Sequence, residues 1–211
     1  MTYIFIRSEF IQQKLKLLNP IIEQQFLKQV SKTIREEHEK HFQYLAKLLK
    51  FKTTDQLANH LRLFFCASEH NFSAKKFHEL CDGKGPTITI IRSTSKHLFG
   101  GYASISWNSN NSCSSAPGSF LFSIDKQTMH TIYRNEDKAI GGFETSGLAF
   151  GGSDLTLSDE RYPKTPHWSD LGATYSLPEG ISFQSTQARS YLAGAYEFGI
   201  EEYEVFGVEM N

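Results

Sequence analysis

The chain has 211 residues, enough for one large domain or for a smaller domain with an appendage. Its formal net charge is −1, which argues against a basic surface and therefore against nucleic-acid binding as the main function. The sequence contains no uninterrupted run of about 18 apolar residues, so it predicts no transmembrane helix.

Glycine and charge divide the sequence into two parts. All 15 glycines lie at or after Gly83. The first 60 residues carry ten lysines and arginines against six acidic residues, whereas the rest carries twelve against seventeen. A glycine-free segment suits helices, and a glycine-rich segment suits strands and turns. The sequence therefore predicts a mildly basic helical part followed by a mildly acidic β-rich part.

The first 50 residues have the pattern of an amphipathic helix. Apolar residues recur at a spacing of three or four, at Ile22, Phe26, Val30, Ile34, Phe42, Leu45 and Leu49. We interpret residues 1–50 as a separate helical segment, a short coiled coil or a helical hairpin, which would let two chains associate. A helix lying on a membrane surface is the alternative, although its polar face carries charges of both signs.

Residues 51–211 are predicted to form the main domain. A short helix is expected over residues 52–61, a strand over 61–67, and a helix that begins after Ser73 and ends before Gly83. Beyond this glycine the apolar period changes to two. Strands are predicted over residues 87–93, 101–107, 119–125, 128–133, 149–158, 190–198 and 202–208.

Many short strands with turn residues between them are typical of an α+β, mainly β fold: an antiparallel sandwich or barrel with short peripheral helices. Trp107 and Phe122 are predicted to lie in its core. At the doublet Gly151-Gly152 we expect unusual backbone angles or a close approach of another segment. Replacing either glycine is therefore expected to damage folding.

No catalytic, cofactor or metal motif is recognisable. The segment Gly83 to Pro86 closes a helix and opens a strand, whereas a phosphate-binding loop opens a helix. His38 and His41 lie one turn apart, as do His78 and Cys81, but each pair is only half of a metal site. A G-x-S-x-G nucleophile motif is also missing. We therefore expect no catalytic residue, no cofactor and no metal.

Acidic residues gather in two places. Asp154 and Ser158 would share one face of the strand predicted there, with Asp159 at its end. Such carboxylates suit acid–base chemistry or cation binding, or they accept hydrogen bonds from turn backbone. The final fifteen residues contain several glutamates and no base, which protects a strand edge or faces a basic partner. The candidate partner-binding residues are Asp154, Ser158, Asp159, Glu201, Glu202 and Glu204.

The three cysteines are an odd number without C-x-x-C spacing, which favours a reducing, intracellular compartment. Cys66 and Cys81 adjoin predicted secondary structure and are expected to be buried and inert. Cys113 lies in a loop rich in Asn and Ser, so it is the thiol expected to be exposed. An enzyme or a thiol-based antioxidant is therefore the alternative to a purely binding function.

From about Leu61 onward the chain resembles the TLDc domain of the oxidation-resistance and nuclear-receptor-coactivator-like proteins. The resemblance rests on the order of several motifs. They are Leu63-Phe64-Phe65-Cys66-Ala67, Gly83-Lys84-Gly85-Pro86-Thr87-Ile88-Thr89-Ile90-Ile91, Phe99-Gly100-Gly101-Tyr102, Ser119-Phe120-Leu121-Phe122-Ser123 and Gly151-Gly152-Ser153-Asp154-Leu155-Thr156-Leu157-Ser158-Asp159. The last of these matches the family's Gly-Gly-x-Asp-Leu-x-Ile-Ser-Asp signature, with Leu157 where Ile is usual.

The resemblance implies a two-sheet antiparallel β-sandwich and a role in protection against oxidative damage. Several members of the family bind the peripheral, cytosolic sector of the vacuolar proton-pumping ATPase. The family brings no established catalytic residues. We therefore expect a non-enzymatic interaction module in the cytoplasm that reaches vacuolar or endolysosomal membranes through a partner.

Overall fold

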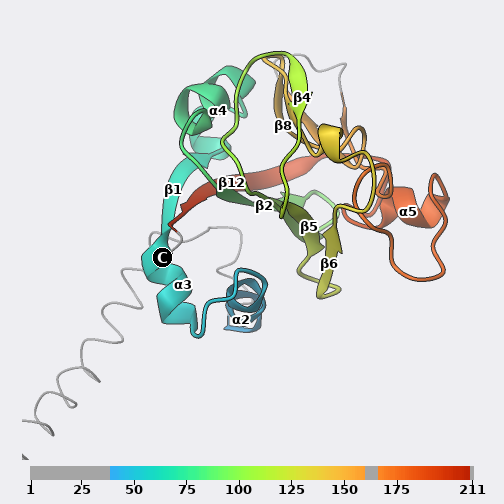
Figure 1. Cartoon of the computed structure of the whole chain (residues 1–211), viewed down its shortest axis with the longest axis horizontal. Coiled ribbons are helices and arrows are strands. Elements are labelled where there is room, and N and C mark those ends of the chain that lie inside the picture. Colours follow the sequence, from blue (N-terminus) through green and yellow to red (C-terminus); the bar gives the residue numbers. More distant parts are fainter. Residues whose placement is uncertain (1–38, 160–165, 210–211) are drawn as a thin grey trace, which may run out of the picture.

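A computed structural model describes residues 39–159 and 166–209 of the chain. These residues form two six-stranded antiparallel sheets that pack face to face, with short helices around them (Figure 1). The predicted β-sandwich is therefore confirmed. The part of the predicted coiled coil that precedes residue 39 lies outside the described residues. None of the described helices has the length and apolar character that a membrane crossing requires.

The two sheets draw on strands from distant parts of the chain. The first sheet has the order β1 (Leu61–Cys66), β12 (Ile200–Val208), β2 (Thr87–Ser93), β3 (Leu98–Ala103), β5 (Phe120–Ser123) and β6 (Thr128–Thr131). The second has the order β11 (Glu197–Phe198), β10 (His167–Trp168), β9 (Leu155–Ser158), β8 (Ser146–Phe150), β7 (Ile140–Gly142) and β4 (Ser112–Ser114). Among the helical elements of the described part are three short ones: η1 (Ser68–His70), η2 (Glu136–Lys138) and α5 (Thr186–Ser190).

The main core lies between the two sheets. Trp107 is 1% exposed and packs edge-on against Phe77 and Phe150, while its indole N–H donates to the Thr87 hydroxyl over 2.8 Å. Gly101 of β3 has no room for a side chain, because Cζ of Phe150 lies 2.6 Å from where a Cβ would stand. The Phe-Gly-Gly segment of β3 thus lets an aromatic ring of the opposite sheet approach the backbone.

A second core lies on the outer face of the first sheet. There, α2 (Glu39–Leu48) and α3 (Thr54–His60) cover the sheet from below in Figure 1. Phe42, Leu45 and Leu49 are at most 5% exposed and belong to one cluster with apolar residues of β2, β3, β5 and β12. These three positions of the predicted helical seam therefore contact the chain's own sheet. The domain boundary that we expected at residue 50 lies between α2 and α3, and both helices belong to the layer that packs on this sheet.

The short helix predicted after residue 73 is confirmed as α4 (Ala74–Cys81). Its N-cap is Ser73, whose hydroxyl accepts the Lys76 N–H over 3.3 Å. Phe77 is fully buried and packs at right angles against Phe65 of β1. The helix therefore covers one end of the sandwich, on the side of the sheets away from α2 (Figure 1).

Three predicted strands are wrong in their bounds. The strand predicted over residues 101–107 covers only the end of β3, which stops at Ala103. Residues 149–158 form parts of β8 and β9 with a tight turn at 151–154, because Gly151 has a left-handed φ of +65° that reverses the chain. Residues 190–198 leave α5 through turns, and only 197–198 are strand. The hydroxyl of Ser185 accepts the Ala188 N–H over 3.1 Å and so starts α5, which ends at Ser190, the first residue of the predicted strand.

Replacing Phe122 with Ala should lower the free energy of unfolding by about 3–5 kcal/mol, because its ring is fully buried under α2. Met129 stands opposite Phe122 in the strand register but is 49% exposed, and Met129→Ala should change stability by less than about 0.5 kcal/mol. Urea denaturation of the full chain measures both variants. Equal losses of unfolding free energy in the two variants would contradict the burial of Phe122 in the second core.

Candidate functional site

The most distinctive buried group is the carboxylate of Asp154, in the turn between β8 and β9. It is 0% exposed and accepts four backbone N–H groups of one loop. The donors are those of Gly172 (2.7 Å), Ala173 (3.0 Å), Thr174 (2.8 Å) and Tyr175 (3.2 Å). We call this arrangement the aspartate clamp: Asp154 with the amides of residues 172–175. It fixes a loop that lies about twenty residues further along the chain.

Gly151 is part of the same arrangement. A Cβ at this position would overlap Oδ2 of Asp154, and the backbone has a φ of +65°. Gly152, by contrast, is exposed, and the nearest atom to a Cβ there is Cδ of Lys138 at 3.9 Å. The expectation that both glycines are required therefore narrows to Gly151, whose missing side chain leaves room for the clamp.

Burial raises the pKa of Asp154 from 3.8 to about 6, while the four N–H groups act to lower it. The carboxylate is therefore still ionised at neutral pH. Its oxygens already accept hydrogen bonds from the backbone, and no face of the group is open to solvent. Such a carboxylate stabilises the loop and has no room to accept a proton from a substrate.

The other side of the clamped loop is held through its carbonyl groups. The Gly172 carbonyl accepts the Tyr133 hydroxyl over 2.8 Å and a guanidinium N–H of Arg134. The Ala173 carbonyl accepts Nε of Arg134 over 3.1 Å and the amide of Asn135 over 2.8 Å. The guanidinium of Arg134 also lies against the exposed ring of Phe183, 4.7 Å from its centre. The sequence reasoning missed these contacts, because no local pattern links residues 133–135 to residue 172.

His130 of β6 holds the end of the same loop. Its Nδ1 lies 2.8 Å from the Ser176 carbonyl and therefore donates, and Nε2 lies 3.0 Å from the Thr128 hydroxyl. The ring is 2% exposed. Burial is the largest cause that lowers the pKa of His130 below 6.5, and Lys126 adds to it. The ring is therefore neutral at neutral pH, as this pair of contacts requires.

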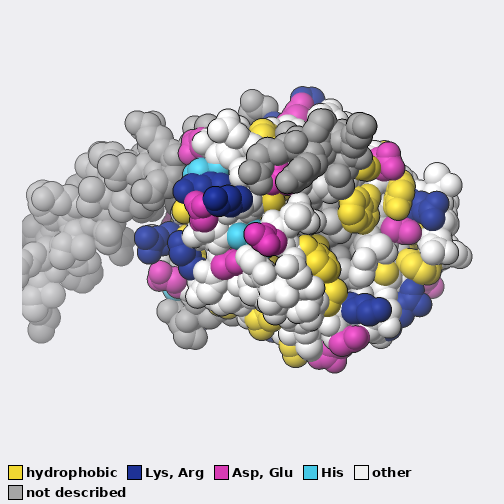
Figure 2. Space-filling view, turned by 90° about the horizontal axis from the view of Figure 1, so that it is seen from above, with side chains coloured by type: hydrophobic (Ala, Val, Ile, Leu, Met, Phe, Trp, Pro, Cys, Tyr) yellow, Lys and Arg dark blue, Asp and Glu magenta, His cyan; other side chains and the backbone are white. Residues whose placement is uncertain are grey.

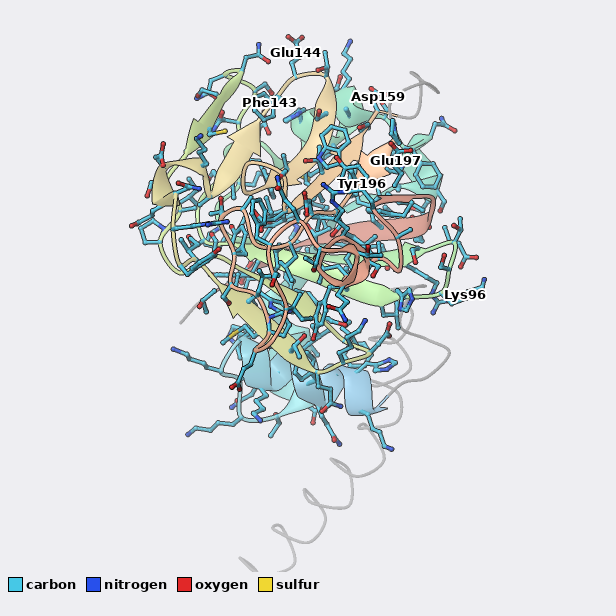
Figure 3. All side chains as sticks on the ribbon, turned by 90° about the vertical axis from the view of Figure 1, so that its right-hand side faces the viewer. Lys96, Phe143, Glu144, Asp159, Tyr196 and Glu197 are labelled. Atoms are coloured by element: carbon cyan, nitrogen blue, oxygen red, sulfur yellow. The ribbon has the colours of Figure 1, made fainter. Side chains whose placement is uncertain are left out.

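Ser158 and Asp159 are structural as well. They are 5% and 1% exposed. The Ser158 hydroxyl donates to the Pro166 carbonyl over 2.9 Å, and Oδ2 of Asp159 accepts the Ala74 N–H over 3.2 Å at the start of α4. A carboxylate is favourable there because the helix N-terminus carries partial positive charge. Figure 3 shows Asp159 near the end of the domain opposite α2.

The glutamates of β12 are also mostly buried, because this strand is not the sheet edge that we expected but lies between β1 and β2. Glu202 and Glu204 are 8% and 2% exposed. Oε1 of Glu202 accepts the Ser68 N–H over 3.0 Å, and the Cys66 thiol donates to Oε2 over 3.6 Å. Glu201 has a side chain that is 31% exposed and pairs with Lys96. Of the six predicted partner-binding residues, only Glu201 therefore reaches the surface.

The cysteines differ in exposure as predicted. Cys66 and Cys81 are buried, whereas Cys113 is partly exposed. Burial raises the pKa of the Cys81 thiol to about 12, and it also raises the pKa of Cys66. Because the thiolate is the reactive form, these two positions are unsuited to thiol chemistry at neutral pH.

A model of one protein family, described as the TLDc domain, matches residues 28–209. The chain belongs to the TLDc domain family. The match begins well before Leu61, where the resemblance in the sequence was expected to start, and it includes α2. The TLDc domain of this chain therefore comprises both the sandwich and the helices that cover its first sheet.

Gly151→Ala should lower the free energy of unfolding of this TLDc domain by roughly 2–4 kcal/mol, because the new methyl group meets the Asp154 carboxylate at a left-handed φ. The matched variant Gly152→Ala should stay within about 0.5 kcal/mol of the wild type. Thermal melting followed by circular dichroism compares them. A wild-type-like melt for Gly151→Ala would contradict the clamp.

Acidification should destabilise the wild type more than a His130→Asn variant, whose amide still donates to the Ser176 carbonyl without titrating. The pKa of His130 is lower in the folded state than the unfolded value of 6.5, so its stabilisation is complete above 6.5 and is lost as the pH falls through the folded pKa. The raised pKa of Asp154 has the opposite sign, since it favours the folded state at low pH, and it cancels in this comparison.

Urea midpoints of the two proteins between neutral pH and about pH 5 measure this difference. A parallel pH dependence in wild type and variant would show that His130 does not titrate as its burial requires.

Proposed function

We propose that this TLDc domain is a non-enzymatic docking module of the cytoplasm. Its partner is the peripheral sector of the vacuolar proton-pumping ATPase, through which it reaches vacuolar or endolysosomal membranes and contributes to protection against oxidative damage. Membership of the TLDc family supports the oxidation-resistance role at family level. The pump as partner rests on family precedent alone.

One observation supports a binding rather than a catalytic function. The polar residues of the family's Gly-Gly-x-Asp signature stabilise the fold: Asp154, Ser158 and Asp159 are buried, and each is hydrogen-bonded to main-chain groups of another segment. A catalytic acid, base or nucleophile needs an open coordination position beside a substrate. These three side chains do not offer one.

Thiol chemistry is the competing function, and the structure weakens two of its three candidate groups. Cys66 and Cys81 are buried and have raised pKa values. Cys113, which is partly exposed on β4, is the thiol that an antioxidant function would have to use. Among the described residues, none forms a hydrogen bond or ion pair with this thiol that would activate it.

Self-association through the N-terminal segment also stays a proposal. The seam positions at residues 42, 45 and 49 are occupied by contacts with the sheet. Pairing between two chains would therefore have to use the positions that precede residue 39.

The docking proposal predicts that the purified full chain co-elutes with the purified peripheral sector of the pump in size-exclusion chromatography. An unrelated β-sandwich protein of similar size serves as the control and should elute alone. The same run with the Gly151→Ala variant, if it is unfolded, tests whether the intact sandwich is needed. Separate elution of wild-type chain and an intact peripheral sector would remove the pump as the partner.

A further inference from the structure

A shallow groove of about 450 Å³ lies between α2 and the last two strands of the first sheet. Its apolar lining consists of Tyr44 and Leu48 of α2, Phe120 of β5 and Met129 of β6. Met129 is 49% exposed, one of five large apolar side chains in the described part of the chain that are exposed to a comparable extent. The groove therefore presents an uncovered apolar surface in a concave setting.

Among the residues that the structure describes, the charged side chains that line this groove are lysines. Lys47 and Lys50 line it, and they also line an adjoining hollow of about 340 Å³ to which Lys52 contributes. All three are exposed, and none forms an ion pair with another described residue. We call these two hollows with their three lysines the α2 groove. By contrast, the face opposite α2 carries acidic and basic side chains side by side (Figure 2).

Helix stabilisation accounts for only part of this lysine cluster. Lys47 lies in the last turn of α2, where a cation interacts favourably with the helix dipole. Lys50 and Lys52 follow the helix and gain little from it, since the effect falls off within a turn. A local concentration of positive charge on a chain of net charge −1 attracts negatively charged partners.

Tyr44 lines the groove through atoms other than its hydroxyl. The hydroxyl of Tyr44 is buried and has no hydrogen-bond partner among the described residues. Burial raises the pKa of Tyr44 to about 12, so the phenol keeps its proton at neutral pH. A bound segment therefore reaches the rest of the Tyr44 side chain but not its hydroxyl.

We propose that the α2 groove is a docking site for an acidic segment of a partner protein that carries an apolar side chain. The apolar side chain enters between Leu48 and Met129, and the carboxylates of the segment meet Lys47 and Lys50. The inference rests on the proposed function in treating the domain as a docking module. It goes further by naming the surface and the chemistry of what binds there.

The shape of the site favours a protein segment over a lipid surface. A membrane is broad, and proteins insert protruding apolar side chains into it. Here the apolar residues and the lysines line a concave hollow together. A side chain of a partner enters such a hollow, whereas a flat bilayer passes over it.

Selection of random-sequence peptides displayed on phage against the purified full chain tests the proposal without any assumed partner. We expect the recovered peptides to be rich in Asp and Glu around a Leu, Phe or Trp. A fluorescently labelled synthetic copy of the most frequent peptide then serves as the probe for variants. Its binding should weaken as the salt concentration rises.

Charge reversal at Lys47 and Lys50 together (K47E and K50E) should weaken binding of this probe roughly tenfold or more. The matched control reverses the charge of Lys75 and Lys138, which are exposed lysines of α4 and η2. It changes the net charge by the same amount, and its affinity for the probe should equal that of the wild type. Met129→Ser should weaken binding about fivefold, because it removes an exposed apolar side chain from the groove. Thermal melting of every variant confirms that it is folded.

The proposal is overturned if the recovered peptides are neutral or basic, if none is recovered, or if the two charge reversals have equal effects. Binding of the wild type, but not of the Lys47/Lys50 variant, to phosphatidylserine vesicles without any selected peptide would assign the groove to lipid instead. Failure of the pump to co-elute leaves the peptide result intact, so the two proposals can fail separately.

Discussion

The buried carboxylate of Asp154 is the interaction on which the family's signature motif depends. An ionised carboxylate inside a protein is strongly unfavourable unless several hydrogen bonds satisfy it. Four amides of residues 172–175 do so here, and those amides would themselves be unfavourable if they were buried without an acceptor. The turn after β8 and the distant loop therefore stabilise each other, and Gly151 has no side chain because the carboxylate occupies that space.

The aspartate clamp is part of a larger hydrogen-bonded frame. Its loop is held from the opposite side by Tyr133, Arg134 and Asn135, so the motif and its surroundings form a rigid internal frame. Asp154, Ser158 and Asp159 resemble a reactive cluster in the sequence, but each already forms hydrogen bonds with main-chain groups of the fold. The exposed surface outside this frame is formed by other elements, among them those that line the α2 groove.

Helix α2 shows why an amphipathic pattern does not identify its own partner. The spacing of Phe42, Leu45 and Leu49 predicts an apolar stripe, and the stripe is real. The same stripe satisfies a coiled coil, a membrane surface or a sheet of the same chain, because the pattern records only which side is apolar. The outer face of the first sheet, with Ile88, Ile90 and Phe122, supplied the partner. It is assembled from strands that no local pattern connects to the helix.

The sequence by itself determined the type of most elements, an antiparallel sandwich or barrel as the class of fold, and the buried Trp107 and Phe122. These properties are written in periodicity and capping residues, which act over a few neighbouring positions. The order of the motifs indicated the family, and only that resemblance implied two sheets. Only the tertiary structure decided that β12 lies inside its sheet, that Glu202, Glu204 and Asp154 are interior groups, and that one glycine of the doublet is required. Strand order, burial and close approach depend on segments far apart in the chain, and their contacts leave no local pattern.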